Sequence, residues 1–220
     1  SMGYEKVAIL GFSAGGHLCC AAATLYDAGD PDADDPIERI SSRPDGFIPC
    51  YAVVSFTSFR HQGSVENLLG DKAQDYALLR RFSAELNVTA DTPPAFIWHT
   101  STDNGVPVEN SILMAKALRE HGIHFAIHLF ETGRHGLSLA NEEWAENGNA
   151  AGIYAMDQFF ATIKAVEEGK VEPTEDKKMM LQFFQMPEEE RAKYIPKGIP
   201  NESVAMWPQL ADCWLRNLPE

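Results

Sequence analysis

Short apolar runs alternate with amphipathic segments along the chain as far as residue 140. Four of these runs contain no regular polar alternation, which is typical of strands buried on both faces of a parallel sheet. The runs are Val7–Phe12, Phe47–Phe56, Ala95–Thr100 and His124–Phe130. Helical patterns lie between them, at Ala14–Ala28, Gln74–Arg81 and Val108–His121. Strands that alternate with helices predict the α/β class, with a mostly parallel sheet of about four strands flanked by helices.

The pattern changes beyond residue 144. Three further segments have helical patterns, namely residues 150–168, 174–186 and 187–194, and an amphipathic helix is expected at Val204–Leu218. Charged or proline-containing breaks separate them. We therefore predict an α/β core at residues 1–144, a helical insertion at residues 145–200, and a final helix within residues 201–220 that packs back on the core.

Composition narrows the range of partners. The chain has 220 residues, of which 45% are hydrophobic, enough for one domain with a sizeable core and an appendage. Its net charge of −14 argues against binding to nucleic acid or to an anionic membrane surface. No apolar run is long enough to span a bilayer, and no secretion signal is seen before Val7. We expect a cytoplasmic protein that acts on a neutral small molecule.

The cysteines and histidines do not form a metal-binding pattern. Cys19 and Cys20 are adjacent, whereas Cys50 and Cys213 lie far from them and from each other, so there is no CxxC pair. Buried, reduced thiols are the expected state. His124 and His128 share a strand face, but no acidic ligand is spaced with them. We therefore expect no metal and no cofactor.

A G-x-S-x-G pentapeptide directly follows the first apolar run. It consists of Gly11, Phe12, Ser13, Ala14 and Gly15. In a sharp strand-to-helix turn the flanking glycines avoid side-chain clashes, and the serine hydroxyl projects above the sheet. The amide groups of the following helix then point toward the reacting oxygen. The alternative interpretation is a plain tight turn, but the strand before it and the helix after it favour a nucleophile elbow.

Two further residues could activate Ser13. Asp103 follows the third apolar run, and His135 lies between two glycines after the fourth. Both positions are loops at the carboxyl ends of strands, which converge at one edge of a parallel sheet. Asp103 would orient His135, and His135 would take the proton of Ser13. Taken singly, Asp103 could form a turn and His135 could be a surface histidine. His17, in the elbow helix, is expected to be packed and not catalytic.

Several motifs together carry a resemblance to a known family. They are GFSAGGHL (Gly11–Leu18), RPD (Arg43–Asp45), NLLG (Asn67–Gly70), TPPAFIWHTSTDNGVPVENS (Thr92–Ser111) and GRHGLSLA (Gly133–Ala140). The chain resembles the α/β-hydrolase esterases over residues 4–144, and more narrowly their acetylesterase and feruloyl-esterase-like branch, often called acetyl-xylan-esterase-like. The resemblance implies an α/β-hydrolase fold and a catalytic triad of Ser13, Asp103 and His135. It also implies an oxyanion-hole donor at the Ala14 amide and, as substrates, short acyl esters on sugars.

The chain also departs from that family. The nucleophile follows the first strand here, whereas about four strands precede it in the family. The His-Gly-Gly oxyanion motif of the missing part occurs nowhere in this sequence. We therefore expect a truncated sheet, and the loss of one oxyanion donor would lower the rate by about 10²–10³. The run Val7–Phe12 would then have an unpaired apolar edge. We expect self-association into a homo-oligomer, or the helices of residues 145–200, to cover it.

Three functional interpretations remain open from the sequence. The first is a serine esterase that cleaves short-chain, acetyl-type esters, with activity lowered by the missing oxyanion loop. The second is a peptidase or aryl formamidase of the same fold. The third is a truncated, weakly active or inactive hydrolase remnant that acts as an oligomer or binding module.

Overall fold

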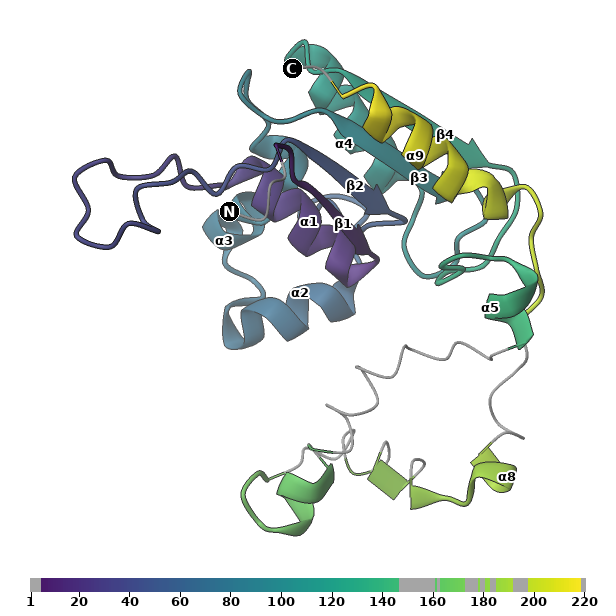
Figure 1. Cartoon of the computed structure of the whole chain (residues 1–220). Helices are drawn as coiled ribbons and strands as arrows, with labels where there is room; N and C mark the ends of the chain where they lie inside the picture. The colour runs from purple at the N-terminus through teal and green to yellow at the C-terminus, as the bar shows by residue number, and fades with distance from the viewer. Residues whose placement is uncertain are drawn as a thin grey trace. The chain divides into compact units, whose positions relative to one another are not determined.

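The computed structural model describes residues 5–146, 161, 163–172, 178, 181–182, 185–191 and 198–218. It divides into two compact units (Figure 1), one formed by residues 1–139 and 203–220 and the other by residues 140–202. The predicted division into three domains, at residues 144 and 200, stays a prediction.

The larger unit contains a sheet of four strands and the helices around it. The strands are β1 (Ala8–Phe12), β2 (Gly46–Cys50), β3 (Ala95–Thr100) and β4 (Phe125–Phe130). The α-helices are α1 (Ala14–Thr24), α2 (Gln62–Leu69), α3 (Tyr76–Arg81), α4 (Glu109–Glu120) and α9 (Trp207–Arg216). Single 3₁₀ turns are η1 (Gly70–Lys72), η2 (Ala84–Leu86) and η3 (Val204–Met206).

Each strand pairs in parallel with the next one in the chain. The order is β1-β2-β3-β4, with Ile9 opposite Phe47 and Ile97 opposite Ile127. The predicted parallel sheet of about four strands is confirmed. Because all the strands run the same way, the loops after β1, β3 and β4 all leave the sheet at the carboxyl ends of the strands, where the candidate site lies.

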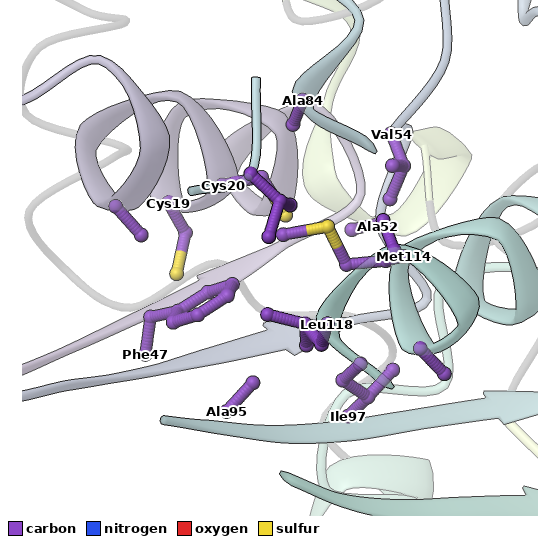
Figure 2. Close-up of a cluster of buried hydrophobic side chains, with 14 residues drawn as sticks. Cys19, Cys20, Phe47, Ala52, Val54, Ala84, Ala95, Ile97, Met114 and Leu118 are labelled. Atoms are coloured by element: carbon purple, nitrogen blue, oxygen red, sulfur yellow. The ribbon is translucent and has the colours of Figure 1, made fainter. Parts of the chain in front are cut away.

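One face of the sheet is covered by α1 and α4. Figure 2 shows their side chains packed on those of β2 and β3, with Cys20, Phe47, Ile97, Met114 and Leu118 among the labelled residues. All five are at most 1% exposed. This apolar cluster holds the elbow helix in place, because burying apolar area of this kind contributes about 25 cal/mol per Å².

The opposite face is aromatic and is covered by α9. Side chains alternate along a strand, so Phe96 and Trp98 face away from the apolar cluster. Trp98 stacks on Trp207 with ring centroids 5.5 Å apart, and Phe96 lies 5.9 Å from Trp214. The final helix therefore packs on β3 from the side opposite to α1 and α4.

The second strand is shorter than predicted. The apolar run Phe47–Phe56 is buried throughout, but β2 ends at Cys50. Tyr51 has a positive φ of 36°, which ends the extended conformation. The amides of Val54 and Ser55 then donate to the Asn110 side chain at 2.9 and 3.0 Å and not to a neighbouring strand. A continuous apolar run indicated burial correctly, but could not distinguish a strand from buried coil.

Other differences are local. Helix α2 was not predicted, and α1 ends at Thr24, four residues before the predicted end. Cys19, Cys20 and Cys50 are buried free thiols, as predicted, and burial raises the pKa of Cys19 to about 12. The prediction was wrong for Cys213, which is exposed on α9.

Strand β1 lies at an edge of the sheet. Within the described residues it pairs with β2 alone, and its neighbour Val7 and its own Leu10 are 60% and 46% exposed. Asp45 secures the start of the strand, since its carboxylate accepts the Val7 N–H at 2.7 Å. The predicted unpaired apolar edge is thus present in the described part of the chain.

The smaller unit contains the helices α5 (Glu142–Glu146) and α8 (Glu188–Arg191), and residues 163–167 are also helical. The rest of the predicted helices at 150–168, 174–186 and 187–194 falls mainly on residues outside the described ranges. The two ends of this unit are joined by a hydrogen bond from the Asn201 N–H to the Ala140 carbonyl at 2.8 Å.

Candidate active site

Ser13 occupies the turn between β1 and α1 with φ 53° and ψ −117°. Such a conformation is strained for a residue with a side chain and costs about 1–3 kcal/mol. Three backbone hydrogen bonds maintain it. The Ser13 N–H donates to the Cys50 carbonyl at 3.0 Å, and the Ser13 carbonyl accepts from His17 at 3.1 Å and Val53 at 3.3 Å. The adjacent Ala14 begins the helix, where backbone amides have no intrahelical partner.

The glycines of the elbow are not equivalent. A Cβ on Gly11 would lie 2.0 Å from the Gly15 carbonyl oxygen, so only glycine fits there. An added Cβ on Gly15 would meet nothing within 4 Å in the structure described. The predicted clash therefore exists at Gly11 but not at Gly15. The second crowded position is Gly16, whose added Cβ would lie 2.5 Å from Ala52 Cβ.

The three residues predicted from strand ends lie in one line of hydrogen bonds. Ser13 Oγ is 2.7 Å from His135 Nε2, and His135 Nδ1 is 2.7 Å from Asp103 Oδ2. Gly105 permits this approach, because a Cβ there would lie 2.8 Å from the His135 ring. The arrangement allows one imidazole to accept the Ser13 proton while its other nitrogen donates to a carboxylate.

Asp103 is buried, with a side chain only 1% exposed, yet it is fully hydrogen-bonded. Oδ1 accepts the amides of Gly105 at 2.8 Å and Val106 at 2.9 Å, and Oδ2 faces both His135 and His99. Burial alone raises the pKa of Asp103, but these hydrogen bonds outweigh it and hold the pKa well below its usual range. The carboxylate is therefore charged across the neutral pH range.

The loop that carries His135 is secured from three sides. Tyr51 Oη accepts the Ser138 N–H at 3.2 Å, and Trp207 Nε1 donates to the Ser138 carbonyl at 2.8 Å. Thr100 Oγ1 donates to the Gly133 carbonyl at 2.9 Å. The Tyr51 ring also meets the His135 ring edge-on, with centroids 5.1 Å apart. These contacts restrict the imidazole to the position in which it reaches both neighbours.

A comparison with protein families identifies the chain. The model of the BD-FAE family matches residues 1–118, more than half of the chain and including Ser13 and Asp103. The chain belongs to the BD-FAE family.

Two curated proteins similar to this BD-FAE chain have names that refer to xylan. It is 45% identical over 154 residues to endo-1,4-beta-xylanase B of Butyrivibrio fibrisolvens, an alignment that covers 70% of this chain and 24% of that protein. It is 34% identical over 139 residues to an acetylxylan esterase of Xylanibacter ruminicola, with 61% of this chain and 26% of the relative covered.

A solved structure shows the same fold. The acetyl ester-xyloside bifunctional hydrolase from Caldicellulosiruptor lactoaceticus matches with a TM-score of 0.59 and 42% identity. The match covers 75% of this chain and 57% of that one. The predicted α/β-hydrolase fold is thereby confirmed. The BD-FAE chain spans about a quarter of the length of these two curated relatives.

An apolar cavity of about 380 Å³ lies beside the elbow helix of the BD-FAE chain. Its lining comes from α1, α2 and the segments near Phe56 and Phe82, and comprises Ala14, His17, Leu18, Ala21, Phe56, Ser64, Asn67, Leu68 and Phe82. His17 is packed here, as predicted, stacked on Phe56 at 4.5 Å with its Nε2 2.8 Å from the Phe82 carbonyl. Burial lowers the pKa of His17, so this imidazole is neutral at neutral pH.

Several residues around the site were missed by sequence reasoning. They are His99, Tyr51, Thr100 and Trp207. Each contacts Asp103, His135 or the loop that carries His135. A signal existed for His99, since it is a polar residue within an apolar strand, four positions before Asp103. Tyr51 and Trp207 had no such signal, because each is one aromatic residue among many apolar ones.

Two features are absent from the described residues. No group of three or more His, Cys, Asp and Glu side chains is placed to hold a metal ion in the part of the BD-FAE chain that the structure describes. Across the same ranges, no helix combines the length and the apolar character needed to cross a bilayer. The predicted cytoplasmic location stays a prediction.

Proposed function

We propose that this chain hydrolyses carboxylic esters, with Ser13 as nucleophile, His135 as general base and acid, and Asp103 as the residue that orients His135. The observation that carries the proposal is the pair of 2.7 Å hydrogen bonds that joins Ser13 to His135 and His135 to Asp103. The strained Ser13 backbone at the head of α1 supports it, because such strain collects at functional sites.

The reaction takes place in two stages. Ser13 Oγ bonds to the ester carbonyl carbon while its proton passes to His135 Nε2, and the carbonyl oxygen becomes an oxyanion that the Ala14 N–H stabilises. Collapse breaks the bond to the alcohol oxygen, which takes the proton from His135 and leaves. Water then attacks the acyl-serine, His135 takes the water's proton and returns it to Ser13 Oγ, and the carboxylic acid is released. Asp103 stays ionised throughout and stabilises the imidazolium.

The substrates that we propose are short acyl esters, acetyl esters above all, on sugars. The names of the acetylxylan esterase and of the acetyl ester-xyloside hydrolase support this class. The net charge of −14 also favours a neutral ester over an anionic one.

The experiment joins covalent labelling with turnover. A fluorophosphonate should label Ser13 in the 220-residue chain, and p-nitrophenyl acetate should be hydrolysed. In Ser13→Ala the labelling should vanish and kcat should fall by about 10⁶. A folded wild-type chain that neither labels nor turns over the ester would refute the proposal.

A second candidate function rests on the edge of the sheet. We propose that β1 pairs with β1 of a second copy of this chain, so that the protein acts as a homo-oligomer. The exposed Val7 and Leu10 beside the unpaired edge of the described sheet support it, since edges of this kind recruit other strands. Native mass spectrometry tests it, and a monomer whose β1 amides exchange freely would exclude it.

A further inference from the structure

A second histidine contacts the buried carboxylate. His99 is the fifth residue of β3 and its side chain is 0% exposed. Its Nε2 lies 3.3 Å from Asp103 Oδ2, the oxygen that also faces His135. Asp103 is therefore placed between two imidazoles, of which only that of His135 reaches Ser13.

The neighbours of His99 determine which of its nitrogens carries the proton. Nε2 is 3.0 Å from the Val106 carbonyl oxygen, which can only accept a hydrogen bond. Nε2 must therefore be the protonated nitrogen, and its N–H is shared between this carbonyl and Asp103 Oδ2. Nδ1 is 2.8 Å from Ser111 Oγ, whose hydroxyl can donate to it. Both ring nitrogens of a neutral His99 are thus satisfied.

Ser111 ties this arrangement to a rigid part of the fold. It is buried in the first turn of α4, the helix that packs on the sheet through Met114 and Leu118. The hydrogen bonds run from Ser111 through His99, Asp103 and His135 to Ser13. The Asp103 carboxylate is therefore held by contacts that lead to the core of the larger unit, and not only by its own loop.

We propose that His99 is a positioning residue, held by Ser111 in its Nε2–H form, that fixes Asp103 Oδ2 in line with His135. The inference rests on the proposed function, because it concerns the same three residues. Without His99, the carboxylate retains the Gly105 and Val106 amides on Oδ1 but loses the second donor on Oδ2. It can then rotate away from His135.

Among the described residues, the titratable side chains that act on Asp103 include His99 from β3 and His135 from the loop after β4. They also include Tyr51, whose electrostatic interaction with Asp103 adds to the burial that raises the pKa of the tyrosine. Burial raises the pKa of Asp103, and the donors from His135 and His99 are the main groups that lower it. Loss of the His99 donor should therefore let Asp103 take a proton at a higher pH.

The first test needs no turnover. Nitrogen-15 NMR of the side-chain imidazoles in the wild-type chain should show His99 as a neutral Nε2–H tautomer. In His99→Leu, the carbon-13 signal of the Asp103 carboxyl should titrate at a higher pH than in wild type. A His99 in the Nδ1–H form, or an Asp103 titration that His99→Leu leaves unchanged, would overturn the proposal even if the chain proved inactive on esters.

The second test uses kinetics with p-nitrophenyl acetate. His99→Leu should lower kcat by about 10–100-fold with KM nearly unchanged. The acid limb of the rate profile should move to lower pH, because the carboxylate that stabilises the protonated His135 has turned away. His99→Gln, whose amide can still donate to Asp103, should recover most of the rate and the wild-type profile. Ser111→Ala should show a smaller loss.

A matched control separates positioning from stability. Met114→Ala also removes buried contacts on α4 but touches none of these hydrogen bonds, so it should lower the melting temperature while keeping the pH profile. If His99→Gln behaves like His99→Leu, or if Met114→Ala moves the acid limb as far, His99 is only a structural residue and the proposal fails.

Discussion

The two sides of the candidate site differ in how completely the protein encloses them. On the side of Asp103, both carboxylate oxygens accept hydrogen bonds and the side chain is 1% exposed. On the side of Ser13, the nucleophile follows an edge strand, and Leu18 in its helix is 70% exposed. The two sides meet in one hydrogen bond, between His135 Nε2 and Ser13 Oγ.

This difference between the Asp103 side and the Ser13 side shows which part of the candidate site must be rigid. The groups that move protons must keep fixed distances, since misplacement by about 1 Å can cost 10²-fold in rate. The groups that receive an ester must remain accessible. In the proposed mechanism, the described chain thus has a closed side that handles protons and an open side on which the Ala14 amide is the proposed oxyanion donor. Substitutions at five positions, with two controls, test this contrast.

The largest effect is expected on the closed side. Asp103→Asn removes the charge that orients His135 and stabilises its protonated form, so kcat for p-nitrophenyl acetate should fall by about 10⁴. Labelling of Ser13 by the fluorophosphonate should slow in parallel. A loss of less than tenfold would show that the buried carboxylate does not take part.

The same variant has a pH signature. The folded state lowers the pKa of Asp103, whereas the unfolded value is about 3.9. The carboxylate therefore contributes stability above about pH 4 that is lost as the pH falls through the lower, folded pKa. Urea unfolding between about pH 7 and pH 2 should show a steeper acid loss in wild type than in Asp103→Asn. The exposed Asp71→Asn is the control and should follow wild type.

The elbow on the open side should tolerate an alanine at Gly15 but not at Gly11. Gly11→Ala places a Cβ 2.0 Å from the Gly15 carbonyl oxygen and should cost about 1–3 kcal/mol in the free energy of unfolding. Gly15→Ala meets nothing within 4 Å and should leave that free energy unchanged or raise it by up to about 1 kcal/mol. Thermal unfolding of the two variants decides, and equal losses would contradict the geometry of the turn.

Trp207→Phe keeps the aromatic stack on Trp98 but removes the N–H that holds the Ser138 carbonyl. We expect a loss of about 1 kcal/mol in stability, and a roughly tenfold fall in kcat because the His135 loop loosens. Trp214→Phe, the same change on the same helix, contacts Phe96 and lies away from the loop. It should keep kcat, and a similar fall there would point to a general effect of α9.

The smallest effect on stability is expected at the open edge. Leu10→Lys places a charge on a side chain that is already 46% exposed, so the free energy of unfolding should change by less than about 0.5 kcal/mol. Its effect should appear in assembly, because a lysine on an edge strand opposes pairing with a second copy. Native mass spectrometry should show fewer oligomers than in wild type, and an unchanged distribution would exclude the β1 edge as the contact.

The contrast also explains how far the sequence could predict the molecule. Strands buried on both faces leave continuous apolar runs, so β1, β3 and β4 were found within about a residue of their bounds. The convergence of Ser13, Asp103 and His135 could be predicted because glycine-rich turns and strand ends mark such positions, whereas their catalytic roles stay a prediction. The segment after Cys50 was misjudged, because coil that bonds to Asn110 is as apolar as a strand.

Residues that act through others were harder to find. Trp207 lies 69 positions from Ser138 along the chain, and only the packing of α9 brings the two together. Tyr51 reaches the Ser138 amide from a backbone with positive φ, which its residue type does not suggest. Sequence patterns report local spacing, whereas these contacts depend on the docking of whole helices on the sheet.

The hydrogen bond between the Asn201 N–H and the Ala140 carbonyl has a consequence for how the sequence can evolve. This hydrogen bond of 2.8 Å joins the two ends of the segment between them, while Ser138 and Trp207 are hydrogen-bonded to each other just outside it. A segment with such ends can be lengthened, shortened or exchanged without altering the path of its flanks. Changes in the segment between Ala140 and Asn201 should therefore leave the loop that carries His135 in place. We expect relatives to vary most in that segment.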